Sequence, residues 1–317
     1  MPVVRRLRDW QTYFSDRHFD RYVAANLTRA EIFQGVTGQC LESMSAAKRM
    51  GSRTALDVVT LHIAEFGAGQ DRECAKFGLR PTVHPWTRKR ILREYDQADV
   101  IRVMSERARR SFLERGFDPQ RVVTVPPPID FDQFPAAEFR ESKFRVSFVG
   151  LIEPWKGFHY LIEAFNKLRL RDSELVLWGG PGARSISQYL RNQTAANPAI
   201  LVKPVEVRSL GYGEVYGKSS VLVHPSLADG FGYVVAEAMA SGIPVIVTDK
   251  TGASDLVVDG QNGYVVPAGD SQAISDRLAH LAGNPSLLKR MGQAARETAR
   301  QLTMENFRAR QRVYLNV

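Results

Sequence analysis

Short apolar runs alternate with longer amphipathic stretches along most of this 317-residue chain. In the first half, the apolar runs predict strands and the stretches with a helical period predict helices. The predicted strands are Thr54–Leu61, Val100–Met104 and Val122–Val125, and the predicted helices are Thr87–Gln97 and one that Ser105 caps and that ends at Gly116. Strands that alternate with helices are typical of a parallel sheet covered by helices.

The second half repeats this alternation with more elements. The predicted strands are Arg145–Val149, Leu175–Trp178, Ile200–Lys203, Val221–His224, Val245–Thr248 and Tyr264–Val266. The predicted helices are Phe158–Leu168, one that begins near Tyr233, Gln272–Ala282, Pro285–Arg300 and Met304–Tyr314. The pattern therefore predicts an α/β protein with two Rossmann-like domains built on parallel sheets.

A proline-rich segment separates the two series. Pro126, Pro127 and Pro128 follow one another and cannot lie in a helix or in an interior strand. We therefore interpret the segment from Pro126 to about Lys143 as a linker. It divides the chain into an N-terminal domain of residues 1–135 and a C-terminal domain of residues 136–317, and the last helix can pack back on the first domain.

Composition excludes some classes of function. Hydrophobic residues make up 44% and charged residues 24% of the chain, as in globular proteins, and no apolar run approaches the roughly 20 residues of a spanning helix. The two cysteines and six histidines form no metal-binding spacing. The net charge of +9 indicates an anionic partner: a diphosphate, an anionic membrane surface or, least favoured because no binding module is visible, nucleic acid.

The first residues carry an amphipathic pattern. Val3, Leu7, Trp10 and Phe14 follow a helical spacing, and arginines stand off that stripe. One interpretation is a helix on a membrane surface. The other, which we favour at this stage, is a helix that packs its stripe on its own domain.

The most informative loop runs from Pro225 to Tyr233, between a predicted strand and a helix. Gly230 and Gly232 allow a ligand to approach the backbone closely. A helix start presents unpaired N–H groups and the positive end of the helix dipole, which together bind phosphate.

Two acids flank this loop, Asp229 and Glu237. Carboxylates accept hydrogen bonds from vicinal hydroxyls, so a pair around a phosphate site suits a sugar–diphosphate–ribose ligand. Each acid also has an ordinary alternative, because Asp229 could cap the helix and Glu237 could be a solvated helix residue.

The run from Asp229 to Ile246, Asp-Gly-Phe-Gly-Tyr-Val-Val-Ala-Glu-Ala-Met-Ala-Ser-Gly-Ile-Pro-Val-Ile, resembles the signature of the retaining family-4 glycosyltransferases, which have the GT-B fold. Further blocks resemble that family in the same order, over about residues 90 to 300. They lie at 148–150, 156–158, 161–165, 252–255, 259–263 and 266–267.

This resemblance implies roles for individual residues. Lys156 would contact the donor diphosphate, and the backbone N–H groups of Phe231, Gly232 and Tyr233 would hold the sugar and the distal phosphate. Gly150 and Gly230 would also belong to the donor site. Asp229 would bind sugar hydroxyls, Glu237 would bind the ribose, and His62 would lie near the transferred sugar, so we name His62 and Asp229 as catalytic candidates. The alternative for His62, equally favoured, is a core histidine whose hydrogen bonds are satisfied. The resemblance also implies a reaction without metal or cofactor, in which stabilisation of the leaving diphosphate dominates.

The chain departs from the family at several positions. Leu151 stands where the family has an arginine, and Arg184 or Arg208 would have to replace it. Asp229 is one methylene shorter than the usual glutamate, and Pro204 stands where glycine is common. The family's opening strand and glycine-rich loop have no counterpart before Asp20, so we expect an incomplete N-terminal domain whose sheet a protein partner or a second copy would cover.

These observations lead to two hypotheses. The first is a glycosyltransferase that moves a sugar from a nucleotide-sugar donor to a saccharide or lipid-linked acceptor for bacterial surface polysaccharide or glycolipid. It would act in the cytoplasm, at the inner membrane face. The second is an inactive donor-binding or scaffold protein derived from such an enzyme.

Overall fold

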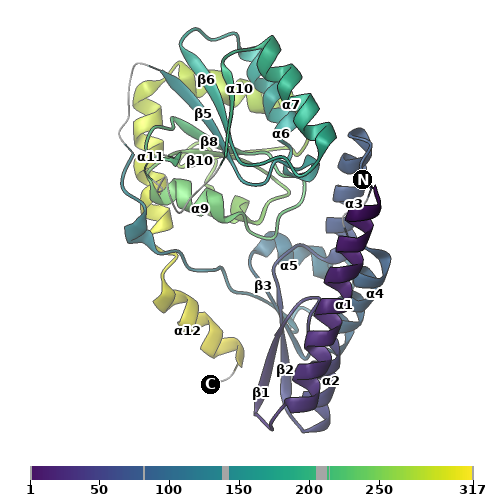
Figure 1. Cartoon of the computed structure of the whole chain (residues 1–317). Coiled ribbons are helices and arrows are strands. Elements are labelled where there is room, and N and C mark those ends of the chain that lie inside the picture. Colours follow the sequence, from purple (N-terminus) through teal and green to yellow (C-terminus); the bar gives the residue numbers. More distant parts are fainter. Residues whose placement is uncertain (1, 81–82, 138–142, 205–212, 214, 316–317) are drawn as a thin grey trace.

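Two parallel β-sheets organise the chain in the computed structural model (Figure 1). The structure describes residues 2–80, 83–137, 143–204, 213 and 215–315, with the backbone alone for residues 2–10. The first sheet has four strands and the second has six. All pairings within the described strands are parallel, which confirms the predicted α/β class.

The first sheet, in the lower part of Figure 1, follows chain order from β1 to β4. Its core contains Leu56 and Ile101 from the strands and Phe112 from a helix, all fully buried. Its strands are β1 (Ile32–Val36), β2 (Arg53–Val58), β3 (Val100–Val103) and β4 (Val122–Thr124), and the accompanying helices are α1 (Pro2–Asn26), α2 (Leu41–Arg49), α3 (Ile63–Lys76), α4 (Pro85–Gln97) and α5 (Glu106–Leu113). As predicted, the Ser105 side chain caps α5.

The sequence predicts no strand before Thr54, and this is wrong. β1 pairs with β2, and a turn that contains Gly38, with φ 93°, leads from it into α2. The signal is weak because Gly35 interrupts the short run, and glycine lowers strand propensity. Gly35 is needed there, because a Cβ at this position would lie 2.5 Å from the Cβ of Cys40. The first sheet has four strands, and the structure does not show the incomplete N-terminal domain that the sequence led us to expect.

The second sheet, in the upper part of Figure 1, has the order β10-β9-β8-β5-β6-β7. Its strands are β5 (Phe144–Val149), β6 (Ser173–Trp178), β7 (Ile200–Lys203), β8 (Val221–His224), β9 (Val245–Thr248) and β10 (Gly263–Val266). One face packs on α6 (Phe158–Leu168), α7 (Arg184–Ala196) and α10 (Ser271–Ala282), and the other on α9 (Tyr233–Ala240) and α11 (Pro285–Ala299). Helices on both faces explain why these strands read as continuous apolar runs.

The segment interpreted as a linker is tied to the second sheet's domain as far as residue 137. Phe134 is buried in that core, and the Ala137 N–H donates to the Ser241 carbonyl at 2.7 Å. The Phe131 ring lies under the guanidinium groups of Arg296 and Arg300. Residues 138–142 lie outside the described residues, and the domain boundary at 135–136 stays a prediction.

The last helix, α12 (Met304–Leu315), returns to the first sheet. Tyr314 is buried there, and the Arg102 guanidinium lies over the Phe307 ring with 5.3 Å to its centroid. The apolar contacts join Phe307, Tyr314 and Leu315 to Ala55, Val100 and Val125. The chain thus crosses between the two sheets twice.

Among the described residues, no helix combines the length and the hydropathy that a membrane span requires, and this includes the 25 residues of α1. The side chains of Val3, Leu7 and Trp10 lie outside the described residues. Phe14, which ends that stripe, is 51% exposed. The interpretation that the stripe packs on its own domain therefore stays a prediction.

Candidate functional site

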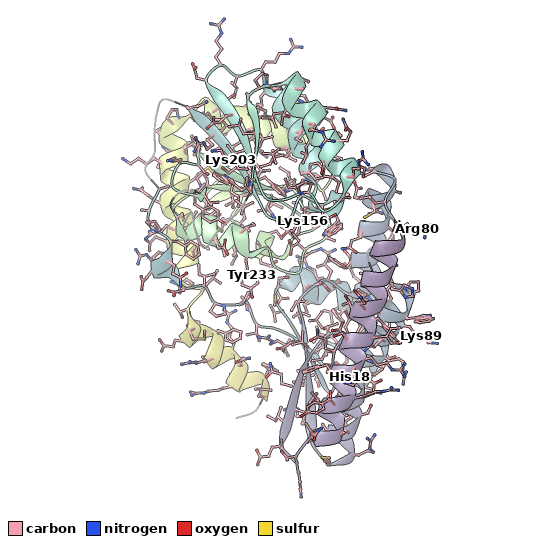
Figure 2. The ribbon with its side chains drawn as sticks, viewed as in Figure 1. His18, Arg80, Lys89, Lys156, Lys203 and Tyr233 are labelled. Carbon is pink, nitrogen blue, oxygen red and sulfur yellow. The ribbon has the colours of Figure 1, made fainter. Side chains whose placement is uncertain are left out.

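The strand order of the second sheet reverses between β5 and β8, which is the topological switch point of the sheet. The chain proceeds outward from β5 through β6 and β7 on one side, and from β8 through β9 and β10 on the other. Ligands of open parallel sheets bind in the crevice at the carboxyl ends of the strands that flank such a switch. The loops at this point hold Gly150, Lys156 and Asp229, and Figure 2 shows Lys156 and Tyr233 on the side that faces the N-terminal domain.

The two loops pack directly on each other. Gly157 has φ 70°, and a Cβ there would overlap the carbonyl oxygen of Pro225. The Leu227 N–H donates to the Trp155 carbonyl at 2.8 Å. Only glycine allows this approach, which holds Lys156 beside the loop after β8.

A charged cluster results from this packing. The Lys156 ammonium forms an ion pair with Oδ2 of Asp229, and the buried His224 ring places Nε2 3.0 Å from the same oxygen. Oδ1 of Asp229 accepts from the Phe231 N–H at 3.4 Å. The Lys156 side chain is 26% exposed and the Asp229 side chain 14% exposed, so the pair lies at the edge of solvent.

The charges of this cluster follow from its surroundings. Burial would raise the pKa of the Asp229 carboxyl, but the Lys156 ammonium and the His224 ring hold that pKa well below its ordinary value. Burial lowers the pKa of His224, which the hydrogen bond to Asp229 offsets only in part. Nε2 of neutral His224 therefore donates to Asp229, while its buried Nδ1 has no partner among the described residues.

The start of α9 faces this cluster. Gly232, with φ 89°, is the N-cap residue, and the N–H groups of Gly232 and Tyr233 donate to no protein acceptor within the described part of the chain. The Phe231 side chain is buried, and Tyr233 is exposed. Free N–H groups at a helix start can hold phosphate oxygens.

Glu237 lies one turn further along α9. The buried Tyr216 donates its hydroxyl to Oε2 of Glu237 at 2.6 Å. Burial raises the pKa of Glu237, and this hydrogen bond lowers it only in part. The Glu237 side chain is therefore fixed by a hydrogen bond, and the alternative interpretation as a solvated helix residue does not hold.

The predicted residue His62 has a different environment. Its Nδ1 accepts from the Ala64 N–H at 3.2 Å and caps α3. Its ring packs on Tyr95, Phe112 and Phe117, with centroids 5.1, 4.9 and 5.7 Å away. Burial lowers the pKa of His62 to about 4. These contacts lie within the N-terminal domain, and within the described residues no hydrogen bond or ion pair joins His62 to Lys156, Asp229 or Glu237, so its catalytic role stays a prediction.

Leu151 follows Gly150 and is 67% exposed. The Ile152 N–H donates to the Gly180 carbonyl at 3.1 Å, so the loops after β5 and β6 lie side by side. Arg184, the first residue of α7, comes from that second loop and is exposed. Arg208, the other candidate substitute, lies outside the described residues.

The N-terminal domain closes on the same loop. The Ser105 hydroxyl donates to the Gly230 carbonyl at 2.8 Å, and a Cβ at Gly230 would overlap the Val59 carbonyl after β2. The Glu106 N–H donates to the Asp255 carboxylate at 2.5 Å. These contacts explain why Gly230 cannot carry a side chain.

Sequence reasoning missed two residues of this site. His224 is read only as the end of a strand, although it precedes Asp229 by five positions, and Ser105 is read only as a helix cap. No spacing rule links Ser105 to Gly230, because 125 positions separate them. The described residues contain no group of three His, Cys, Asp or Glu side chains that could hold a metal ion.

Comparison with known proteins identifies the family of this chain. The sequence profile of a family described as "Glycosyl transferases group 1" matches residues 130–298. A D-inositol 3-phosphate glycosyltransferase from Kribbella flavida is 30% identical over 205 residues, which cover 58% of this chain and 48% of that protein. The capsular polysaccharide biosynthesis glycosyltransferase CapM of Staphylococcus aureus is 33% identical over 160 residues, or 49% of this chain and 41% of CapM. The chain spans about half the length of the curated relatives it matches.

Solved structures share the fold at low sequence identity. Anabaena Alr3699/HepE in complex with UDP has a TM-score of 0.75 and 16% identity, covering 95% of this chain and 81% of that one. The lipopolysaccharide outer core galactosyltransferase WaaB has a TM-score of 0.69 and 16% identity, covering 98% and 80%. With two parallel sheets and a profile match across the site, this chain belongs to the glycosyl transferases group 1, the family-4 glycosyltransferases of GT-B fold.

Proposed function

We propose that this protein transfers a sugar from a nucleoside diphosphate sugar to a saccharide or lipid-linked acceptor, with retention at the anomeric carbon. One observation carries the proposal. At the switch point of the second sheet, the Lys156 ammonium and the Asp229 carboxylate lie beside the free N–H groups at the start of α9, and Glu237 follows one turn along that helix. Cation and N–H groups suit a diphosphate, and carboxylates suit the hydroxyls on either side of it.

Each residue has a role in this reaction. Lys156 and the N–H groups of Gly232 and Tyr233 bind the diphosphate and stabilise the charge it gains on leaving. Asp229 binds hydroxyls of the sugar, and Glu237 binds the ribose. The acceptor oxygen bonds to the anomeric carbon as the bond to the leaving phosphate oxygen breaks, and the acceptor's proton passes to that oxygen.

The comparisons support the class of substrate. One neighbour in the fold is described with UDP and another structure of that protein with UDP-glucose, so we expect a uridine donor first. The relatives named for capsular polysaccharide and for lipopolysaccharide support an acceptor on the way to bacterial surface glycans. Action in the cytoplasm at the inner membrane face stays a prediction.

A turnover assay tests the proposal. The protein is incubated with UDP-, GDP- and ADP-hexoses and with saccharide or lipid-linked acceptors, and release of nucleoside diphosphate and the anomeric configuration of the product are measured. We expect one nucleotide class to support transfer with retention, and Lys156→Met to abolish it. Lys289→Met, at an exposed position on α11, is the matched control and should leave transfer unchanged. An inverted product or an active Lys156→Met would refute the proposed mechanism.

Leu151 supports the second candidate, an inactive donor-binding or scaffold protein. It offers no charge to the diphosphate where the family has a cation, and Lys156 and Asp229 already satisfy each other. Donor binding without release of nucleoside diphosphate for any donor and acceptor would favour this candidate. If Leu151→Arg then released nucleoside diphosphate, the missing cation at position 151 would explain the inactivity of the wild type.

A further inference from the structure

The outward side of α1 carries aromatic and basic residues. Phe14, His18 and Tyr22 follow one another at four-residue intervals, and Arg21 stands beside them. Phe14 is 51% and Tyr22 64% exposed, and His18 and Arg21 are also exposed. Residues four apart on a helix lie on the same side, so these side chains form one stripe.

Two acids of α1 with described side chains, Asp16 and Asp20, face inward. Asp20 is fully buried, accepts from the backbone N–H groups of Glu42 and Ser43, and forms an ion pair with Arg90. Asp16 accepts from Gln39 at 3.1 Å. The outward stripe therefore keeps its positive charge, because neither acid of α1 between residues 11 and 26, the part whose side chains are described, lies on that side.

Helix α4 extends the stripe. The ring of Trp86, 48% exposed, lies 5.8 Å from that of Tyr13 on α1, and Arg90 joins the two helices through Asp20. Lys89 and Arg93 follow Trp86 at helical spacing and are exposed. Figure 2 shows His18 and Lys89 along the same edge of the N-terminal domain.

We define the basic–aromatic face as Phe14, His18, Arg21, Tyr22, Trp86, Lys89 and Arg93. Among the described residues, Arg21, Lys89 and Arg93 form no ion pair, whereas Arg17, Arg88 and Arg90 on the same two helices do. Asp96, one turn beyond Arg93 at the end of α4, is the exposed acid closest to the stripe along that helix. Three cations therefore remain available to an anionic partner.

We propose that this face docks the protein on the surface of a bilayer that contains anionic lipids. Aromatic rings with a polar edge are suited to the headgroup region, and lysine and arginine bind anionic headgroups. The proposal goes beyond sugar transfer and does not depend on it.

Vesicle sedimentation tests the docking. The full chain is mixed with vesicles of phosphatidylcholine alone or of equal parts phosphatidylcholine and phosphatidylglycerol. We expect binding to the anionic vesicles alone, and loss of binding in high salt, because added ions screen the headgroups. Binding to neither vesicle, or equal binding to both, would overturn the proposal.

Two matched triple variants locate the face. Arg21→Glu/Lys89→Glu/Arg93→Glu should bind at least about a hundred-fold more weakly, since each cation near an anionic surface contributes about five-fold. Arg171→Glu/Lys289→Glu/Arg290→Glu, at exposed positions of the other domain, lowers the net charge equally and should bind as the wild type does. Equal loss in both would mean that net charge alone acts, and would overturn the proposal.

A third variant tests the aromatic part. Tyr22→Ser leaves every charge in place and should weaken vesicle binding by up to about ten-fold, because one aromatic side chain no longer enters the headgroup region. Unchanged vesicle binding of Tyr22→Ser would show that this ring does not contribute, and would overturn the aromatic part of the proposal. Sedimentation velocity of the wild type and the first triple variant should give the same mass. A dimer that only the wild type forms would instead identify the face as a contact between copies.

Discussion

The ion pair between Lys156 and Asp229 should respond unequally to removal of its two members. Lys156→Met leaves the Asp229 carboxylate, 14% exposed, without its cation, and Asp229→Asn leaves the Lys156 ammonium, 26% exposed, without its anion. Removing one partner of a fully buried pair costs about 3–5 kcal/mol. Because this pair reaches solvent, we expect about 2–3 kcal/mol for Lys156→Met and about 1 kcal/mol for Asp229→Asn, which keeps its bond from His224.

Urea unfolding at neutral pH measures both values. The double variant should cost less than the sum of the two single variants, and Lys289→Met serves as a control for loss of a surface lysine. Since the pKa of Asp229 is held below its ordinary value, the pair's contribution is present above the unfolded pKa and is lost as the pH falls through the folded one. A larger cost for Asp229→Asn, or additive costs, would refute this description of the cluster.

The remaining predictions concern single positions. The pKa of His62 is about 4 in the folded protein, so protonation of the unfolded chain should lower the stability by up to about 3 kcal/mol as the pH falls from 6.5 to 4. His62→Gln should remove this part of the pH dependence, and urea unfolding of both proteins across that pH range would detect the difference. Gly230→Val should lower donor affinity because its side chain meets the Val59 carbonyl; equal calorimetric affinity would contradict this. Tyr216→Phe removes the hydrogen bond that orients the Glu237 carboxylate, and should weaken binding of a nucleoside diphosphate several-fold in the same calorimetric assay. An unchanged affinity would contradict this role of Tyr216.

Much of the second sheet could be predicted because its strands are buried on both faces. Runs such as Val221–His224 and Val245–Thr248 carry apolar side chains at nearly every position, and the structure places both as predicted. The linker was harder, since consecutive prolines exclude regular structure but do not indicate contacts. Phe131 and Phe134 hold that segment on the domain, and their aromatic character was the available signal.

The site could be predicted in its local parts only. The approach of Lys156 to Asp229 depends on two loops that are brought together by the order of strands in the sheet, which a single sequence does not determine. Asp229 and Glu237 share one segment, and their relation to the start of α9 was accessible from spacing. The environment of His62 could not be predicted in this way, because the three rings around it come from α4, from the end of α5 and from just after it, which are distant from His62 in the sequence.

Calorimetric titration with nucleotide sugars tests the donor site most directly. The wild type, Glu237→Ala and Glu305→Ala, a change at an exposed acid of α12, are each titrated with UDP-, GDP- and ADP-hexoses. We predict that one nucleotide class binds the wild type and Glu305→Ala equally, and binds Glu237→Ala about ten-fold or more weakly through the loss of charge-assisted hydrogen bonds. Absence of binding by every donor, or equal affinity of Glu237→Ala, would contradict a nucleotide-sugar site at the start of α9.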